Sequence, residues 1–206
     1  AADAQTDGDG TTLAPGPASA PATDPADLPA VVDGVVSWRP LTIGGGGFVT
    51  GVVASPAADA LIVARTDVGG AYRWDAASGR WVQLLTSTAA TDETSPGRAE
   101  LHVLRVALAP SDAARVYVAV GDDGNPGEGD ALARNGMVLV SDDGGRTFTA
   151  STQRFFVAGN QRYRTASEQL AVDPTDPDHV LFGTQREGLW QSHDAGASWS
   201  QVPLDD

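Results

Sequence analysis

Two eight-residue stretches, Ser141-Asp-Asp-Gly-Gly-Arg-Thr-Phe148 and Ser192-His-Asp-Ala-Gly-Ala-Ser-Trp199, share the pattern Ser-x-Asp-x-Gly-x-Thr/Ser-aromatic and start 51 residues apart. In such a pattern the Asp side chain can accept hydrogen bonds from turn amides, and the Gly permits a left-handed backbone. The aromatic ring then packs between sheets. Each stretch predicts a tight turn between two strands, with these side chains in structural roles: Ser141, Asp143, Gly145, Phe148, Ser192, Asp194, Gly196 and Trp199.

Each of the two turns closes a longer repeat that the chain contains three times. Every copy runs from an apolar strand through a Pro to a second apolar strand, then through a Gly to an aromatic strand, a tight turn and a last strand; the prolines are Pro56, Pro110 and Pro174. The apolar runs have the length of strands and lack a helical period. Four short strands per repeat are typical of a β-propeller blade. The prediction is an all-β fold of four-stranded antiparallel blades near 48–85, 103–152 and 168–203, within a partial propeller over 31–206.

Composition limits the remaining possibilities. Residues 1–30 are rich in Ala, Pro, Thr and Asp and have no aromatic residue, which predicts a disordered leader or linker.

A net charge of −14 argues against nucleic acid or an anionic membrane as partner, and no apolar run has the length of a membrane span. The chain has no Cys, and His102, His179 and His193 lack metal-ligand spacing, so no metal or cofactor is expected. Its start at Ala-Ala-Asp predicts either a removed secretion signal, hence an extracellular bacterial-type protein, or a beginning inside a longer one.

Asp67 is the candidate catalytic residue. It follows the apolar run Leu61 to Ala64 and begins a Gly-Gly turn. A carboxylate at the end of a rigid strand suits a general base, but an Asp can also cap its own turn. In an up-and-down blade, the connectors alternate between the two ends of the sheet. The long loops 86–102, 121–135 and 153–167 therefore gather at the end that holds Asp67, and loops of that length are commonly functional.

Two stretches resemble a known family. Ile43-Gly-Gly-Gly-Gly-Phe-Val-Thr-Gly51 and Ala64-Arg-Thr-Asp-Val-Gly-Gly-Ala-Tyr-Arg-Trp74 closely resemble the start of glycoside hydrolase family 74, and the similarity covers about residues 37–206. The pattern around Ser141 and Ser192 resembles the Asp-box (BNR repeat) of sialidase-type propellers. Family 74 consists of xyloglucan-cleaving enzymes, typically built from two seven-bladed propellers that bind the glucan in the cleft between them.

The resemblance implies roles for particular residues. Asp67 would be the general base of an inverting endo-β-1,4-glucanase, whose general acid lies in a second propeller outside this chain. The remaining blades and that second propeller are expected in the same polypeptide, so this chain alone should be inactive. Candidate contacts to the polysaccharide are Arg65, Gly69, Gly70, Gly46, Gly47 and Tyr163. The stretch 159–170 departs from the family's glycine-rich sequence, which leaves the preferred glycan open.

Two other functions stay open at this point. A sialidase-like exo-glycosidase would share the Asp-boxes, but it needs an arginine cluster and a Tyr nucleophile that the sequence does not reveal. A non-catalytic propeller could bind glycan or protein through the same end without using Asp67. The aromatic residues Phe155, Phe156 and Tyr163 could stack on sugar rings at this end, or they could be buried beneath the loop.

Overall fold

The computed structural model describes residues 42–58, 61–85, 102–121, 136–160, 164–165 and 169–204, all as strands, turns and loops. The predictions for the leader 1–30, for most of the loop 121–135 and for Tyr163 fall outside these residues. The described residues contain twelve strands: β1 Val49–Ala54, β2 Ile62–Thr66, β3 Ala71–Asp75, β4 Arg80–Gln83, β5 Val103–Leu108, β6 Val116–Val120, β7 Met137–Ser141, β8 Thr149–Ala150, β9 Leu170–Val172, β10 Val180–Gly183, β11 Leu189–Ser192 and β12 Ser200–Gln201. No helix that could cross a membrane occurs in the described part.

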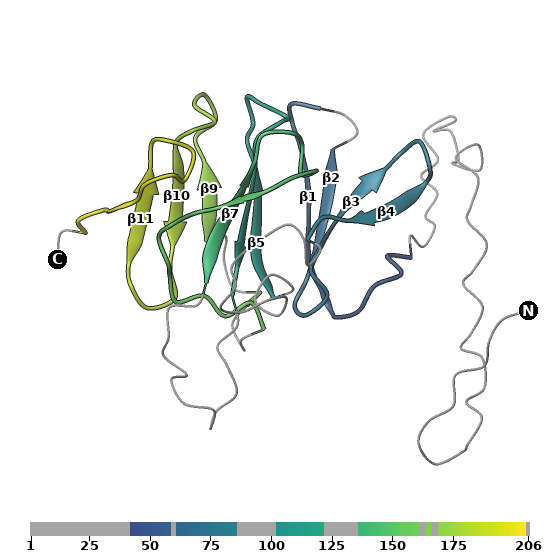
Figure 1. The fold of residues 1–206 in the computed structure, drawn as a ribbon, viewed down its shortest axis with the longest axis horizontal. Helices are drawn as coiled ribbons and strands as arrows, with labels where there is room; N and C mark the ends of the chain where they lie inside the picture. Colours follow the sequence, from purple (N-terminus) through teal and green to yellow (C-terminus); the bar gives the residue numbers. More distant parts are fainter. Residues whose placement is uncertain are drawn as a thin grey trace, which may run out of the picture.

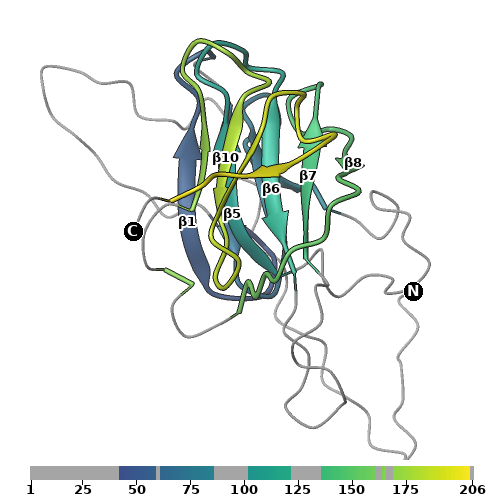
Figure 2. The same cartoon turned by 90° about the vertical axis from the view of Figure 1, so that its left-hand side faces the viewer.

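The strands form three antiparallel four-stranded sheets in the orders β1-β2-β3-β4, β5-β6-β7-β8 and β9-β10-β11-β12. The sheets lie side by side in chain order, and the second stands between the other two (Figure 1). Seen from the third sheet, they stand one behind another (Figure 2). The first strands are neighbours, because β5 contacts both β1 and β9. The predicted all-β fold of four-stranded blades is confirmed.

The second sheet is buried on both faces, so β5 and β6 read as almost continuous apolar runs. Toward the first sheet they present Val106 and Val118, which pack with Val63 and Leu85. Toward the third sheet they contribute another cluster, which is built from Leu104, Ala107, Tyr117, Ala119, Val138, Phe155, Val157, Leu170, Val180 and Phe182. The alternation of side chains along a strand accounts for this two-sided packing.

Phe155 is the centre of the contact between the second and third sheets. Its ring is fully buried and meets the rings of Phe182, Trp190 and Trp199 edge-on at centroid distances of 5.2, 5.6 and 5.3 Å. Phe156 is buried as well, under the guanidinium of Arg186. Of the two roles that the sequence left open for this aromatic pair, the structure shows burial.

The first sheet has an open outward face. β1 and β5 carry the same bulge, at Val49/Gly51 and at Val103/Arg105, so their residues correspond one to one. Val103 and Val106 of β5 are 0% and 3% exposed because the first sheet covers them. Their counterparts Val49 and Val52 of β1 are 43% and 60% exposed. The outward face of the first sheet therefore carries the same kind of apolar side chains that contact a neighbouring blade in the second sheet, but no described residues cover it.

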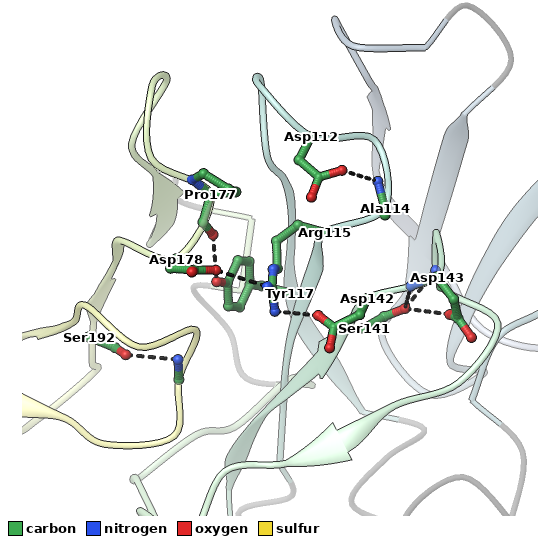
Figure 3. A network of polar contacts seen from close by, with 12 residues as sticks. Asp112, Ala114, Arg115, Tyr117, Ser141, Asp142, Asp143, Pro177, Asp178 and Ser192 are labelled. Carbon is green, nitrogen blue, oxygen red and sulfur yellow. Dashed lines mark hydrogen bonds and ion pairs between the residues drawn. The ribbon is translucent and has the colours of Figure 1, made fainter.

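The short connectors and the Asp-box turns share one end of the sheets (Figure 3). Arg115, which precedes β6, forms ion pairs with Asp142 of the Asp-box turn and, at 2.8 Å, with Asp178 of the third sheet. Beside it, the Tyr117 hydroxyl donates to the carbonyl of Pro177 at 2.7 Å, and burial raises the pKa of this phenol. These contacts join the second and third blades at the end opposite Asp67.

Candidate active site

The site is built on a turn that closes the end of β2. The Thr66 amide and hydroxyl both donate to the carbonyl of Gly70, at 2.9 and 3.0 Å, and the Thr66 hydroxyl accepts the amide of Gly69 at 2.8 Å. Gly70 has a φ of +87°, a conformation that L side chains rarely adopt. Tyr72 of β3 holds the turn from outside by donating its hydroxyl to the Gly69 carbonyl at 2.7 Å.

The carboxylate of Asp67 is held through both of its oxygens. The amide of Phe48 donates to Oδ1 at 2.8 Å, and the guanidinium of Arg164 contacts Oδ2 at 3.0 Å. The Asp67 amide in turn donates to the Phe48 carbonyl at 3.1 Å. Asp67 is buried with 9% of its side chain still exposed, so a small molecule such as water can reach it. An ionised carboxylate has about four acceptor positions, so these two donors leave acceptor capacity for a water.

Glycines let the 44–47 loop approach the turn. A Cβ on Gly69 would come within 1.9 Å of the Gly46 carbonyl oxygen, which is backbone and cannot be displaced easily. A Cβ on Gly47 would lie 2.9 Å from Oδ1 of Asp67, and Gly47 has a φ of +92°. The stretches 44–47 and 67–70, predicted as parts of one site from the sequence, are thus in direct contact.

Arginine side chains connect this turn to the second sheet. Nη1 of Arg65 donates to the Leu104 carbonyl at 2.7 Å and to the Thr50 hydroxyl at 3.1 Å. Nη1 of the fully buried Arg105 donates to the same Leu104 carbonyl at 2.6 Å and to the Arg164 carbonyl at 2.5 Å. The cation whose contact with Asp67 is described is Arg164, at 3.0 Å. Arg73 lines a cavity of about 400 Å³ beside an Asp-box turn.

The third blade repeats the same turn with different chemistry. The Thr184 amide and hydroxyl donate to the Gly188 carbonyl at 3.0 and 2.9 Å, as in the first blade. Gln185 therefore occupies the position of Asp67. Its Oε1 accepts the Ala158 amide at 3.0 Å, so a neutral side chain can hold a backbone amide from this position. An ionisable side chain is not required for the fold of the turn.

The two Asp-boxes have nearly identical hydrogen bonds. In each, the Ser hydroxyl donates to the Asp carboxylate at 2.7 Å, and the Asp accepts the amide and the hydroxyl of the residue four positions later. Ser141 and Ser192 also accept the amides of the boxes' glycines, Gly145 and Gly196, at 2.9 and 2.8 Å. The Ser and Asp side chains therefore accept the hydrogen bonds of backbone amides in their own turns. Phe148 and Trp199 are half-buried and pack against the blade cores.

These hydrogen bonds predict a pH dependence of stability. The Ser198 hydroxyl, then its amide and Ser192, lower the pKa of Asp194 from 3.8 to about 2, and the Thr147 amide and hydroxyl lower the pKa of Asp143. A lowered carboxyl pKa stabilises the fold fully above the unfolded value near 3.8, and this contribution is lost as the pH falls through the folded value. We expect Asp194→Asn to lower the Tm at pH 7 and to differ less from the wild type as the pH falls from 3.8 to about 2.

Thermal melts followed by circular dichroism over this pH range measure the difference. Asp143→Asn, in the equivalent turn, should behave in the same way. A difference in Tm that stays constant between pH 7 and pH 2 would show that the ionised carboxylate is not what stabilises these turns.

The structure also shows what sequence reasoning missed. Arg164 and the amide of Phe48 contact Asp67, and neither was predicted to do so. Phe48 could have been found, because it follows the glycines of the 44–47 loop directly. Arg164 lies 97 residues from Asp67, and no local signal connects them. Within the described ranges, no group of three or more His, Asp or Glu side chains could hold a metal ion.

The described residues form propeller blades with Asp-box turns at one end. At the opposite end, the carboxylate of Asp67 is a candidate acid–base site. No family model matches the chain. It is 40% identical over 168 residues to a xyloglucanase from Paenibacillus sp, covering 81% of this chain and 16% of that protein. It is 35% identical to an oligoxyloglucan-reducing end-specific xyloglucanase from Emericella nidulans, covering 80% of this chain and 19% of that protein.

Among solved structures, the crystal structure of the GH74 xyloglucanase from Xanthomonas campestris is similar with a TM-score of 0.66 and 42% identity, over 80% of this chain and 22% of that one. The resemblance to glycoside hydrolase family 74 is thereby confirmed, and the chain is a family 74-like propeller segment. It spans about a fifth of the length of the relatives that it matches.

Proposed function

We propose that the complete polypeptide is an inverting glycoside hydrolase that cleaves xyloglucan or a related β-1,4-glucan internally, with Asp67 as general base. The carrying observation is the geometry of Asp67, whose two carboxylate oxygens are each oriented by one donor while the side chain stays accessible. The relatives named as xyloglucanases support the substrate class.

The proposed chemistry assigns one step to this chain. Inversion needs a water between the base and the anomeric carbon, which requires the two carboxyl groups to lie about 6.5–9.5 Å apart. The acceptor capacity left on Asp67 would bind this water and take its proton as the C–O bond forms. A carboxylic acid outside this chain would protonate the leaving oxygen. Burial beside an arginine keeps the carboxylate fixed in direction, as a base acting on one water requires.

The chain would supply part of a larger propeller. The open face with Val49 and Val52 fits a further blade, because the equivalent residues of the second sheet are covered by the first. The small share of each relative that this chain covers agrees with further blades and a second propeller in the same polypeptide. Export from a bacterial cell would bring the enzyme to a plant polysaccharide.

Proton NMR of the reaction tests this function directly. The complete polypeptide, incubated with xyloglucan, should release reducing ends that appear first as the α-anomer, since a β-linkage is cleaved with inversion. Mutarotation then produces the β-anomer. Initial appearance of the β-anomer would exclude the inverting mechanism, and absence of any new reducing end would exclude hydrolysis of this glycan.

A glycan-binding propeller without hydrolysis is the second candidate, and one observation favours it. Gln185 holds a backbone amide from the position that Asp67 occupies in the first blade, so Asp67 could serve the same purpose. Binding of xyloglucan oligosaccharides, measured by calorimetry, without release of reducing ends would support this candidate over the hydrolase.

A further inference from the structure

Arg164 is the cation beside the candidate base. Its Nη2 lies 3.0 Å from Oδ2 of Asp67, while the Phe48 amide holds Oδ1, so the two donors approach different oxygens. A buried carboxylate is costly without a partner of opposite charge or hydrogen-bond donors, and Arg164 supplies both. From this geometry we infer that Arg164 is a positioning residue for Asp67, an inference that rests on the proposed hydrolase function.

Arg164 is itself held in place. Its carbonyl accepts Nη1 of Arg105 at 2.5 Å, and Arg105 is fully buried in β5. The same nitrogen donates to the Leu104 carbonyl, which also accepts Arg65, two residues before Asp67 in the chain. Arg164 is therefore tied through the second sheet to the strand that leads into the site, and its guanidinium has a defined place relative to the turn.

This arrangement determines how Asp67 can act. One donor on each oxygen fixes the plane of the carboxylate. The remaining acceptor positions of the two oxygens are left for the attacking water. Without Arg164 the carboxylate would keep the Phe48 amide and could rotate about its last torsion. Arg164 has 24% of its side chain exposed, so it stays at the border of the accessible space and touches the base without being buried beneath it. In this proposal Arg164 contacts Asp67 and does not contact the substrate or the attacking water.

The test uses the complete polypeptide with Arg164→Ala, Arg164→Lys and the control Arg146→Ala. Arg146 is an exposed arginine in an Asp-box turn at the opposite end. We expect Arg164→Ala to lower kcat on xyloglucan about tenfold, the effect of losing one charged hydrogen bond, with little change in KM. Arg164→Lys and millimolar guanidinium added to Arg164→Ala should each restore part of kcat. Arg146→Ala should behave as the wild type, with or without guanidinium.

Each outcome decides between positioning and simple structural support. Unchanged kcat in Arg164→Ala, or a raised KM with unchanged kcat, would overturn the inference. A loss of kcat that neither Lys nor guanidinium restores, with a lowered Tm, would also overturn it, because support of the fold would explain the loss. Asp67→Asn measured in parallel separates the two proposals. If that variant keeps full turnover, the proposed function fails; if it alone is inactive, only the role of Arg164 fails.

Discussion

Asp67→Asn in the complete polypeptide should lower kcat on xyloglucan about a thousandfold while leaving the affinity for xyloglucan oligosaccharides nearly unchanged. Asn has almost the same shape and can still accept the Phe48 amide through its oxygen, so the turn should keep its conformation. It cannot take a proton from water, and a positioned general base contributes about 10²–10⁴-fold to a rate. Steady-state release of reducing ends and calorimetric binding give the two quantities.

Asp194→Asn is the matched control for this variant. It makes the same chemical change in an Asp-box turn, at the end of the sheets opposite Asp67. We expect it to lower stability and to leave kcat near the wild-type value. Equal turnover of Asp67→Asn and the wild type would remove Asp67 as the base and leave it the role that Gln185 has in the third blade.

Gly69→Ala should reduce kcat about a hundredfold or more. The new methyl group would lie 1.9 Å from the Gly46 carbonyl oxygen, so the 44–47 loop and the Asp67 turn must move apart by an ångström or more. A displacement of about 1 Å at a catalytic group can cost about a hundredfold in rate. The Phe48 amide, which follows the loop, would move away from Asp67 as well.

Gly183→Ala provides the comparison. Gly183 stands at the end of β10, next to the equivalent turn, and a Cβ there meets nothing nearer than 3.8 Å. This variant should keep its kcat and its Tm. If Gly69→Ala retains wild-type turnover with an unaltered circular dichroism spectrum, the close approach of the two loops does not position the base.

Local patterns predicted what depends on nearby residues. The Asp-box turns follow from side chains that bond amides within four residues of themselves, and the blades follow from strand-length apolar runs around Pro56, Pro110 and Pro174. Asp67 could be singled out because its own turn and the family resemblance both lie in a short stretch. The Asp-box turns, the strands and the turn at Asp67 could therefore be predicted because the residues that determine them are neighbours in the sequence.

Contacts between distant segments could not be predicted in this way. Arg164 lies in the stretch where the sequence departs from the family. Its guanidinium contacts Asp67, and its carbonyl accepts a hydrogen bond from Arg105 of the second sheet. The packing of Trp74 and Trp81 is a second example of a feature that local patterns do not fix. Both are half-buried and pack edge-on against each other at 5.5 Å, in the sheet whose outward face is open.

The distance in sequence between Asp67 and Arg164 has a consequence for biosynthesis. The two residues are 97 positions apart, so a ribosome that adds about 5–20 residues per second needs about 5–20 s between them. During that interval the first blade has Asp67 but not yet Arg164, so the carboxylate lacks its ion-pair partner. The contact between Asp67 and Arg164 therefore forms late in synthesis, after the second blade has been made.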